Sequence, residues 1–258
     1  MVLKSKFRIF NDIGPVSEDI IYAAGIYSWN GFLESEGVSG LTQRLYESTS
    51  EQIKEWSNAL EMKDAKFFAT NLQSSMHWML LKEFQEHVCY LDIETTGLYR
   101  DFDKVTVVGI YDGHSFQNLV RGRGLSKKAI QKSLSGCKLL VTYYGSCFDL
   151  PFLQSEFYGI DLNIPHFDLC FGGRKVGLTG GLKKIERRLG ISRDSSISSV
   201  DGFEAVTLWY SFQKGNEKSL KKLLDYCMAD TINLSKMAPL VFEKLNQLET
   251  SIRLDHLN

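Results

Sequence analysis

A strand that carries two acids constrains the fold of this chain more than any other feature. The run from Val88 to Ile93 is apolar and rich in residues that favour strands, so it predicts a buried strand. Asp92 and Glu94 stand two residues apart and therefore project from the same side of it. Two acids on one face of a buried strand are costly unless a cation lies between them. The pattern therefore favours a cation-binding site inside the protein.

Two further acids occur in contexts that direct them to the same place. Asp149 follows a turn at Gly145-Ser146 and begins a helical pattern, so its carboxylate can point back toward the strand ends. Asp230 lies in a long helical run, with Tyr226 one turn before it on the same face. Three or four converging carboxylates suit a pair of Mg²⁺ or Mn²⁺ ions, about 3.5–4 Å apart, that hydrolyses a phosphodiester. Tyr226 would then orient the attacking water or contact the scissile phosphate.

Taken in order, these patterns resemble the three exonuclease motifs of the DEDD superfamily. The motifs are Asp92-Ile93-Glu94-Thr95-Thr96-Gly97-Leu98, Gly145-Ser146-Cys147-Phe148-Asp149-Leu150-Pro151 and Tyr226-Cys227-Met228-Ala229-Asp230. A Tyr rather than a His in the third motif marks the DEDDy subgroup. The residues between the motifs, such as His166-Phe167-Asp168-Leu169, are most similar to the YprB-like branch of ribonuclease H-like exonucleases.

The resemblance covers about residues 88–245 and implies a fold, an activity and residue roles. The fold would be α/β and ribonuclease H-like. The activity would be a 3′→5′ exonuclease that releases nucleoside 5′-monophosphates from single-stranded DNA or RNA with a free 3′ end. The cofactors would be two divalent metal ions, Mg²⁺ or Mn²⁺. The implied ligands are Asp92, Glu94, Asp149 and Asp230, with Tyr226 as the water-orienting residue and Thr95 as a substrate contact.

The sequence also departs from the family pattern and leaves alternatives open. Tyr144 and Cys227 stand where Asn is common, although neither position would supply a ligand. Taken singly, each motif has an ordinary interpretation, such as Asp149 as a helix N-cap. Asp168 would be either a supporting acid for the metal site or a structural cap. The alternative functions are a catalytically inactive nucleic-acid-binding module, which has no need of the full acidic set, and an endonuclease, which the helix with Tyr226 disfavours.

The order of predicted elements supports a mixed sheet flanked by helices. Strands are predicted at 88–94, 105–111 and 115–120 as an antiparallel meander, followed by a helix at 126–134 and a strand at 138–143. Helices are predicted at 149–158, 182–189, 204–212 and 217–248, the last interrupted near Pro239. The glycines at 172, 173, 177, 180 and 181 predict a mobile loop before the helix at 182.

Residues 1–87 differ in character and are predicted to form a helical subdomain, with the exonuclease domain at 88–258. They carry 8 Lys and Arg and 12 Asp and Glu, a net charge of −4, whereas the remainder carries +3. The segment Ile13-Gly14-Pro15, with the helical residues after it, resembles half of a helix-hairpin-helix element, which grips phosphate. A short helical leader with a glycine cap is the alternative. We expect Trp29, Trp56 and Trp78 to be core residues.

A basic helix is the best candidate for phosphate contact. Lys183, Lys184, Arg187 and Arg188 have the i, i+4 spacing that makes a stripe on one helix, although a solvated helix face is the alternative. The chain has no run of eighteen apolar residues and no leader pattern, so we expect neither a membrane partner nor secretion. Five cysteines without a Cys-x-x-Cys pair suit a reducing cytoplasm.

Overall fold

A five-stranded mixed sheet forms the centre of the computed structural model, which describes residues 2–197 and 200–255. The strands are β1 (Val88–Thr95), β2 (Val105–Tyr111), β3 (Phe116–Val120), β4 (Leu139–Thr142) and β5 (His166–Asp168), in the order β3-β2-β1-β4-β5. The first three pair antiparallel, whereas β4 lies parallel to β1 and β5 lies parallel to β4. The antiparallel meander predicted for the first three strands is confirmed.

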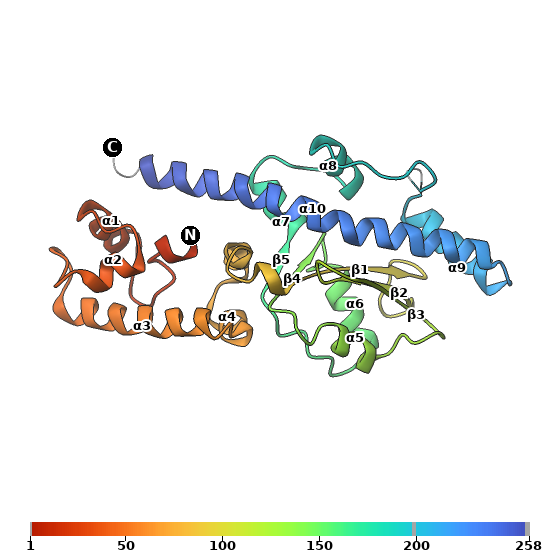
Figure 1. The fold of residues 1–258 in the computed structure, drawn as a ribbon, viewed down its shortest axis with the longest axis horizontal. Helices are drawn as coiled ribbons and strands as arrows, with labels where there is room; N and C mark the ends of the chain where they lie inside the picture. The colour runs from red at the N-terminus through yellow and green to blue at the C-terminus, as the bar shows by residue number, and fades with distance from the viewer. Residues whose placement is uncertain (1, 198–199, 256–258) are drawn as a thin grey trace.

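Helices cover both faces of this sheet (Figure 1). On one face lie α5 (Lys127–Ser133) and α6 (Asp149–Glu156). On the other, α10 (Glu217–Asp255) runs along the sheet, accompanied by α7 (Leu169–Lys175), α8 (Leu182–Arg188) and α9 (Gly202–Gln213). Successive side chains along β1 point to opposite faces of the sheet. Leu91 and Ile93 join the hydrophobic cluster under α5 and α6, so Asp92 and Glu94 face α10.

A glycine on β2 allows α10 to approach the acidic strand closely. Gly109 stands beside Asp92 in the antiparallel ladder. A Cβ atom on Gly109 would lie only 2.5 Å from Thr231 Oγ1 and 2.8 Å from Cys227 Sγ of α10, which is closer than side chains tolerate. The missing side chain therefore brings the helix that carries Asp230 against the strand that carries Asp92.

The predicted interruption of the last helix at Pro239 is wrong. Proline removes one backbone donor, but α10 continues through it to Asp255. Met237, Ala238, Val241 and Phe242 are buried at helical spacing around Pro239, so packing on this side holds the helix together. Among the described residues no helix, α10 included, combines the length and apolar character that a membrane crossing requires.

The glycines at 172 and 173 do not form the predicted mobile loop; they lie buried in α7. A Cβ atom on Gly172 would lie 2.7 Å from Phe167 Cε2 and 3.4 Å from Leu245 Cδ1. The absence of a side chain thus lets α7 pack closely on β5 and α10. Glycine is a poor helix former, so the prediction failed because tertiary packing overrode local propensity.

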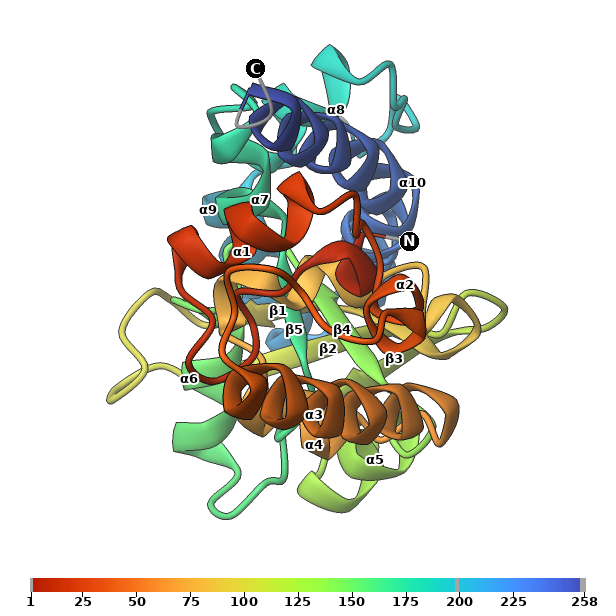
Figure 2. The same cartoon turned by 90° about the vertical axis from the view of Figure 1, so that its left-hand side faces the viewer.

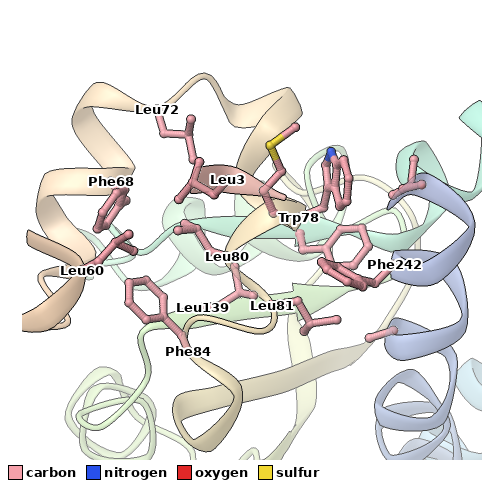
Figure 3. Close-up of a cluster of buried hydrophobic side chains, with 14 of the residues drawn as sticks. Leu3, Leu60, Phe68, Leu72, Trp78, Leu80, Leu81, Phe84, Leu139 and Phe242 are labelled. Atoms are coloured by element: carbon pink, nitrogen blue, oxygen red, sulfur yellow. The ribbon is translucent and has the colours of Figure 1, made fainter. Parts of the chain in front are cut away.

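The residues before β1 are helical and belong to the same core as the sheet. They form η1 (Leu3–Ser5), α1 (Pro15–Ala23), α2 (Trp29–Glu34), α3 (Gln43–Glu61), α4 (Ala65–Asn71), η2 (Ser74–Leu80) and η3 (Gln85–His87) (Figures 1 and 2). Trp29, Trp56 and Trp78 are buried, as predicted. Figure 3 shows Leu80 and Phe84 among side chains that join these helices to Leu139 of β4 and Phe242 of α10. A division into two domains at 87/88 remains a prediction. One hydrophobic cluster includes residues on both sides of that boundary.

Candidate active site

Three separate segments contribute four acids to one cavity of about 510 Å³. Asp92, Glu94 and Thr95 of β1 line it together with Asp149, Tyr226 and Asp230. Carboxylate oxygens of Asp92 and Glu94 and the sulfur of Cys227 all lie within 4.8 Å of one another. Asp149, the first residue of α6, accepts a hydrogen bond at 3.2 Å from the backbone N–H of Ile93. The structure thus brings together the acids that the sequence places on three motifs.

Burial makes the ionised form of these acids costly. Glu94, Asp149 and Asp230 are buried and Asp92 is partly buried. Burial, reinforced by the neighbouring carboxylates, raises the pKa of Asp92 and of Glu94 well above the usual range. Burial also raises the pKa of Asp149 to about 7. Burial raises the pKa of Asp230 as well, although Arg193 works in the opposite direction.

The donor set fits hard divalent cations. Glu94 Oε1 is buried and accepts no hydrogen bond from any polar group of the described residues. Such an oxygen costs free energy unless a cation or proton meets it. Four carboxylates offer the all-oxygen coordination that Mg²⁺ and Mn²⁺ prefer. The neighbouring Cys227 is a poor additional ligand, because burial raises the pKa of its thiol well above the usual range and keeps it protonated.

Tyr226 lies near two cations and one turn before Asp230. The Lys183 Nζ lies 5.2 Å from the centroid of its ring, and the Arg193 guanidinium carbon lies 5.9 Å away. Burial, followed by the charge of Asp230, raises the pKa of Tyr226 well above its usual value. The phenol therefore keeps its proton at neutral pH and can act as a hydrogen-bond donor.

Arg193 is a site residue that the sequence reasoning missed. Its side chain is only 6% exposed and forms an ion pair with Asp230. Its Nε and a terminal nitrogen donate to Glu186 of α8 at 2.5 and 2.7 Å. Glu186 also accepts a hydrogen bond at 3.0 Å from Asn233 of α10. Arg193 therefore supplies a fixed positive charge at the acid that α10 contributes.

No local pattern around Arg193 could have revealed this role. It lies in a polar connection after α8, and Asp230 is 37 residues away in sequence. A weaker signal was present in Glu186, an acid within the basic run of α8. An acid in that position needs a partner once the helix packs.

The predicted basic helix approaches the cavity at one end. Lys183 reaches the Tyr226 ring, whereas Lys184, Arg187 and Arg188 are exposed. The Arg187 Nε donates to the Lys183 carbonyl at 3.3 Å, and Arg188 donates to the Gly177 carbonyl at 3.1 Å. Thr95 donates its hydroxyl to the Gly97 carbonyl beside the cavity. Substrate contact by these residues stays a prediction.

Asp168 acts as a structural cap and braces the second motif. One carboxylate oxygen accepts from the backbone N–H groups of Tyr144 and Cys170, at 2.9 and 3.0 Å. The other accepts from the Ser146 backbone at 3.0 Å and from its hydroxyl at 2.7 Å. Three of these hydrogen bonds fix the loop that leads into Asp149, and the fourth caps α7.

A comparison with protein families agrees with the fold. Residues 89–241 match the model of the RNase H superfamily. Among solved structures, Brucella melitensis NrnC is 19% identical, with 69% of this chain and 85% of that chain covered and a TM-score of 0.46. The same protein with bound Mg²⁺ is 19% identical, with the same shares covered and a TM-score of 0.43. The Aedes aegypti Nibbler EXO domain is 12% identical, with 70% and 91% covered and a TM-score of 0.46. The comparison with curated proteins found no match. The expected ribonuclease H-like fold is confirmed.

Proposed function

The chain belongs to the RNase H superfamily, and on that premise we propose that it is a metal-dependent 3′→5′ exonuclease of single-stranded nucleic acid. One observation carries the proposal. Four acids from three motifs line one cavity, and a buried oxygen of Glu94 accepts no hydrogen bond within the described residues. A protein that only binds nucleic acid gains nothing from repulsive buried acids at its binding site.

Asp92, Glu94, Asp149 and Asp230 hold two divalent cations in this proposal. Such cations, when bound, generate a hydroxide nucleophile and stabilise the leaving oxygen of a phosphodiester. A hydrogen bond from the Ile93 N–H holds Asp149 in place. Asp92 and Glu94 are held by the pairing of β1 within the sheet. Rigid attachment of this kind keeps the ligands in place before substrate arrives.

Tyr226 and Lys183 position the substrate rather than the metal. The protonated Tyr226 hydroxyl donates to the attacking water or to a phosphate oxygen. Lys183, beside the same ring, offers a positive charge to the phosphate. The Tyr226 and Asp230 pair is similar to that of exonucleases that grip a 3′ terminus, which supports release of nucleoside 5′-monophosphates.

The test is a product ladder from end-labelled strands. Purified protein is incubated with 5′-labelled single-stranded DNA and RNA in Mg²⁺ or Mn²⁺. We expect a ladder that descends from the 3′ end, inhibition by a blocked 3′-hydroxyl, and no product in EDTA. Asp230→Asn, which removes a proposed metal ligand, should lose most of this cleavage. Asp225→Asn is its matched control, because Asp225 lies on the same helix and pairs with Lys221 on the surface. Cleavage in chelator, or internal cuts in a circular strand, would contradict the proposal.

A second candidate is a nucleic-acid-binding module without catalysis. The ion pair between Arg193 and Asp230 favours it, because the guanidinium takes up a carboxylate that a metal pair needs. The two functions differ in metal binding. A binding module would retain strands without cleaving them, and calorimetric titration with Mn²⁺ would detect no ion bound at the acids.

A further inference from the structure

Two exposed aromatic side chains stand at the rim of the candidate active site. Tyr144 is 43% exposed and Phe171 is 38% exposed. Their ring centroids lie 6.0 Å apart with an angle of 32° between the planes. The guanidinium carbon of Arg174, which is also exposed, lies 5.2 Å from the Phe171 centroid. Aromatic faces with a neighbouring cation are the surfaces on which unpaired nucleobases stack.

The pair separates two neighbouring cavities. Tyr144 and Arg174 line the cavity that contains the acids. Phe171 and Lys175 line a second cavity, of about 350 Å³, which reaches Ser75 of η2. Because the two rings are in contact, they form the ridge between the cavities. A strand that enters the acid cavity by this route passes over the ridge.

The backbone of Tyr144 gives a second, independent reason to expect a ligand. Its φ is +66°, a left-handed conformation that Asn and Gly adopt more readily than an aromatic residue. The conformation is held by the hydrogen bonds of Tyr144 and Ser146 to Asp168. A large ring kept in a strained backbone position, and left exposed, contributes little to folding.

We infer that Tyr144, Phe171 and Arg174 form a stacking subsite for the nucleobase on the 5′ side of the scissile phosphate. The inference rests on the proposed function, since the 3′-terminal nucleotide must occupy the acid cavity. The next base then stacks on the ridge. Arg174 and Lys175 attract the phosphates that continue toward the second cavity. Stacking is tolerant of base identity, so the subsite selects unpaired strands rather than a sequence.

The experiment measures base stacking directly and requires no cleavage. Single strands carry 2-aminopurine as the second nucleotide from the 3′ end and are titrated with the 258-residue chain, with Ca²⁺ in place of Mg²⁺. We expect stacking to quench the fluorescence of the bound wild-type complex. Tyr144→Asn combined with Phe171→Ala should abolish the quenching and weaken binding roughly 5- to 150-fold. Tyr158→Asn is the control, because Tyr158 is 93% exposed and lines neither cavity.

An abasic nucleotide at the same position completes the cycle. The abasic strand should bind the wild type more weakly than the intact strand does, by about the factor that the double variant loses with the intact strand. The double variant should bind the abasic and the intact strand almost equally well. Tyr144→Asn alone relieves backbone strain, so this variant should fold at least as stably as the wild type. Equal losses from the abasic strand in both proteins would overturn the subsite while leaving the exonuclease proposal intact. Absence of metal-dependent cleavage would overturn the exonuclease proposal alone, because quenching is read from binding.

Discussion

At Asp230, the guanidinium of Arg193 competes with the divalent ion that we propose the neighbouring acids bind. Burial favours its neutral form, and Arg193 offsets part of that cost. The charge of Arg193 is shared with Glu186, which holds the guanidinium from the other side. A metal ion at Asp230 must therefore displace Arg193 or accept its proximity.

Arg193→Gln should lower the stability of the metal-free protein and raise its affinity for Mn²⁺. Without metal, the variant leaves buried Glu186 and Asp230 without their cation, so unfolding in urea and EDTA should require about 3–5 kcal/mol less free energy. With Mn²⁺, calorimetric titration should give tighter binding, because no guanidinium is displaced. Arg123→Gln, which breaks an exposed pair with Glu217, should leave the stability almost unchanged. Weaker Mn²⁺ binding would show that Arg193 supports the metal site.

Asp230→Asn and Tyr226→Phe should affect different steps. Asp230→Asn removes a negative charge that the cations require, so both Mn²⁺ affinity and turnover should fall steeply. Tyr226→Phe removes one hydroxyl, so Mn²⁺ should still bind while turnover falls by roughly 10²–10⁴. Titration calorimetry and single-turnover cleavage measure the two effects, with Tyr210→Phe as the control on an exposed tyrosine of α9. Wild-type cleavage by Tyr226→Phe would make Tyr226 a packing residue.

These residues also show what the sequence can and cannot predict about the site. Asp92, Glu94 and Asp149 each lie at a position that local pattern defines, a strand or the start of a helix, so their convergence could be inferred from the fold class. Arg193 lies in a connection without periodicity, and its partners come from the preceding helix α8 and from the distant helix α10. Contacts of that kind follow from packing, which no local pattern encodes.

At the scale of elements, β5 joins the sheet to the helices before it through two histidines. The His166 backbone N–H donates to His77 Nδ1 of η2 at 2.9 Å, and the His166 ring lies 2.8 Å from the Thr142 hydroxyl of β4. Burial lowers the pKa of His166 to about 4, although Asp168 acts in the opposite direction. His77, whose pKa burial also lowers, further disfavours a charge there.

Acid should therefore weaken this junction. Between pH 6.5 and 4 the unfolded chain binds a proton at His166 that the folded protein does not, so stability is lost as the pH falls. We expect the wild type to lose about 2–3 kcal/mol more than His166→Gln between pH 7 and pH 4.5. Urea unfolding at both pH values measures this difference, and the acids of the active site cancel from the comparison. Equal losses would mean that His166 is protonated in the folded protein.

The basic helix α8 should contribute to binding through long-range charge. Replacing Lys183, Lys184, Arg187 and Arg188 with Ala should flatten the salt dependence of single-strand binding by up to about 0.7 log units per lost phosphate contact. Lys183→Ala alone should account for one contact, because Lys183 lies beside Tyr226. Arg44→Ala with Lys54→Ala, on exposed positions of α3, is the matched control. An unchanged salt dependence would mean that α8 faces solvent and does not contact the nucleic acid.

Element prediction succeeded where the local pattern and the packing agree. The strands predicted at 88–94 and 105–111 alternate or run apolar in the way that a covered sheet requires, and they form at Val88–Thr95 and Val105–Tyr111. Gly172 and Pro239 disagree with the helices that contain them. Both are accommodated by packing: Phe167 and Leu245 lie beside Gly172, and residues around Pro239, Phe242 among them, are buried in the core. The partners that bury these helices lie on other elements, so no local pattern predicts them.

At the scale of the whole molecule, one hydrophobic cluster runs from the N-terminal helices through the sheet to α10. It includes Leu80 and Phe84 before β1, Leu139 of β4, and Phe242 of α10 (Figure 3). The same α10 carries Asp230 at the candidate active site. Packing of the first 87 residues therefore supports the helix that completes the acidic cavity.

We accordingly expect the chain to unfold as one cooperative unit, although the sequence suggests a boundary at 87/88. Leu80→Ala opens a cavity among fully buried side chains and should reduce the free energy of unfolding by about 2–5 kcal/mol. Calorimetry should show a single transition moved to lower temperature, and Mn²⁺ should raise that same transition, because ligand binding to the folded state stabilises everything that unfolds with it. Leu240→Ala, on a 41% exposed position of α10, should leave the transition nearly unmoved. Two transitions, of which Leu80→Ala lowers one and Mn²⁺ raises the other, would instead establish independent domains, and the N-terminal helices would then have no part in holding Asp230 in place.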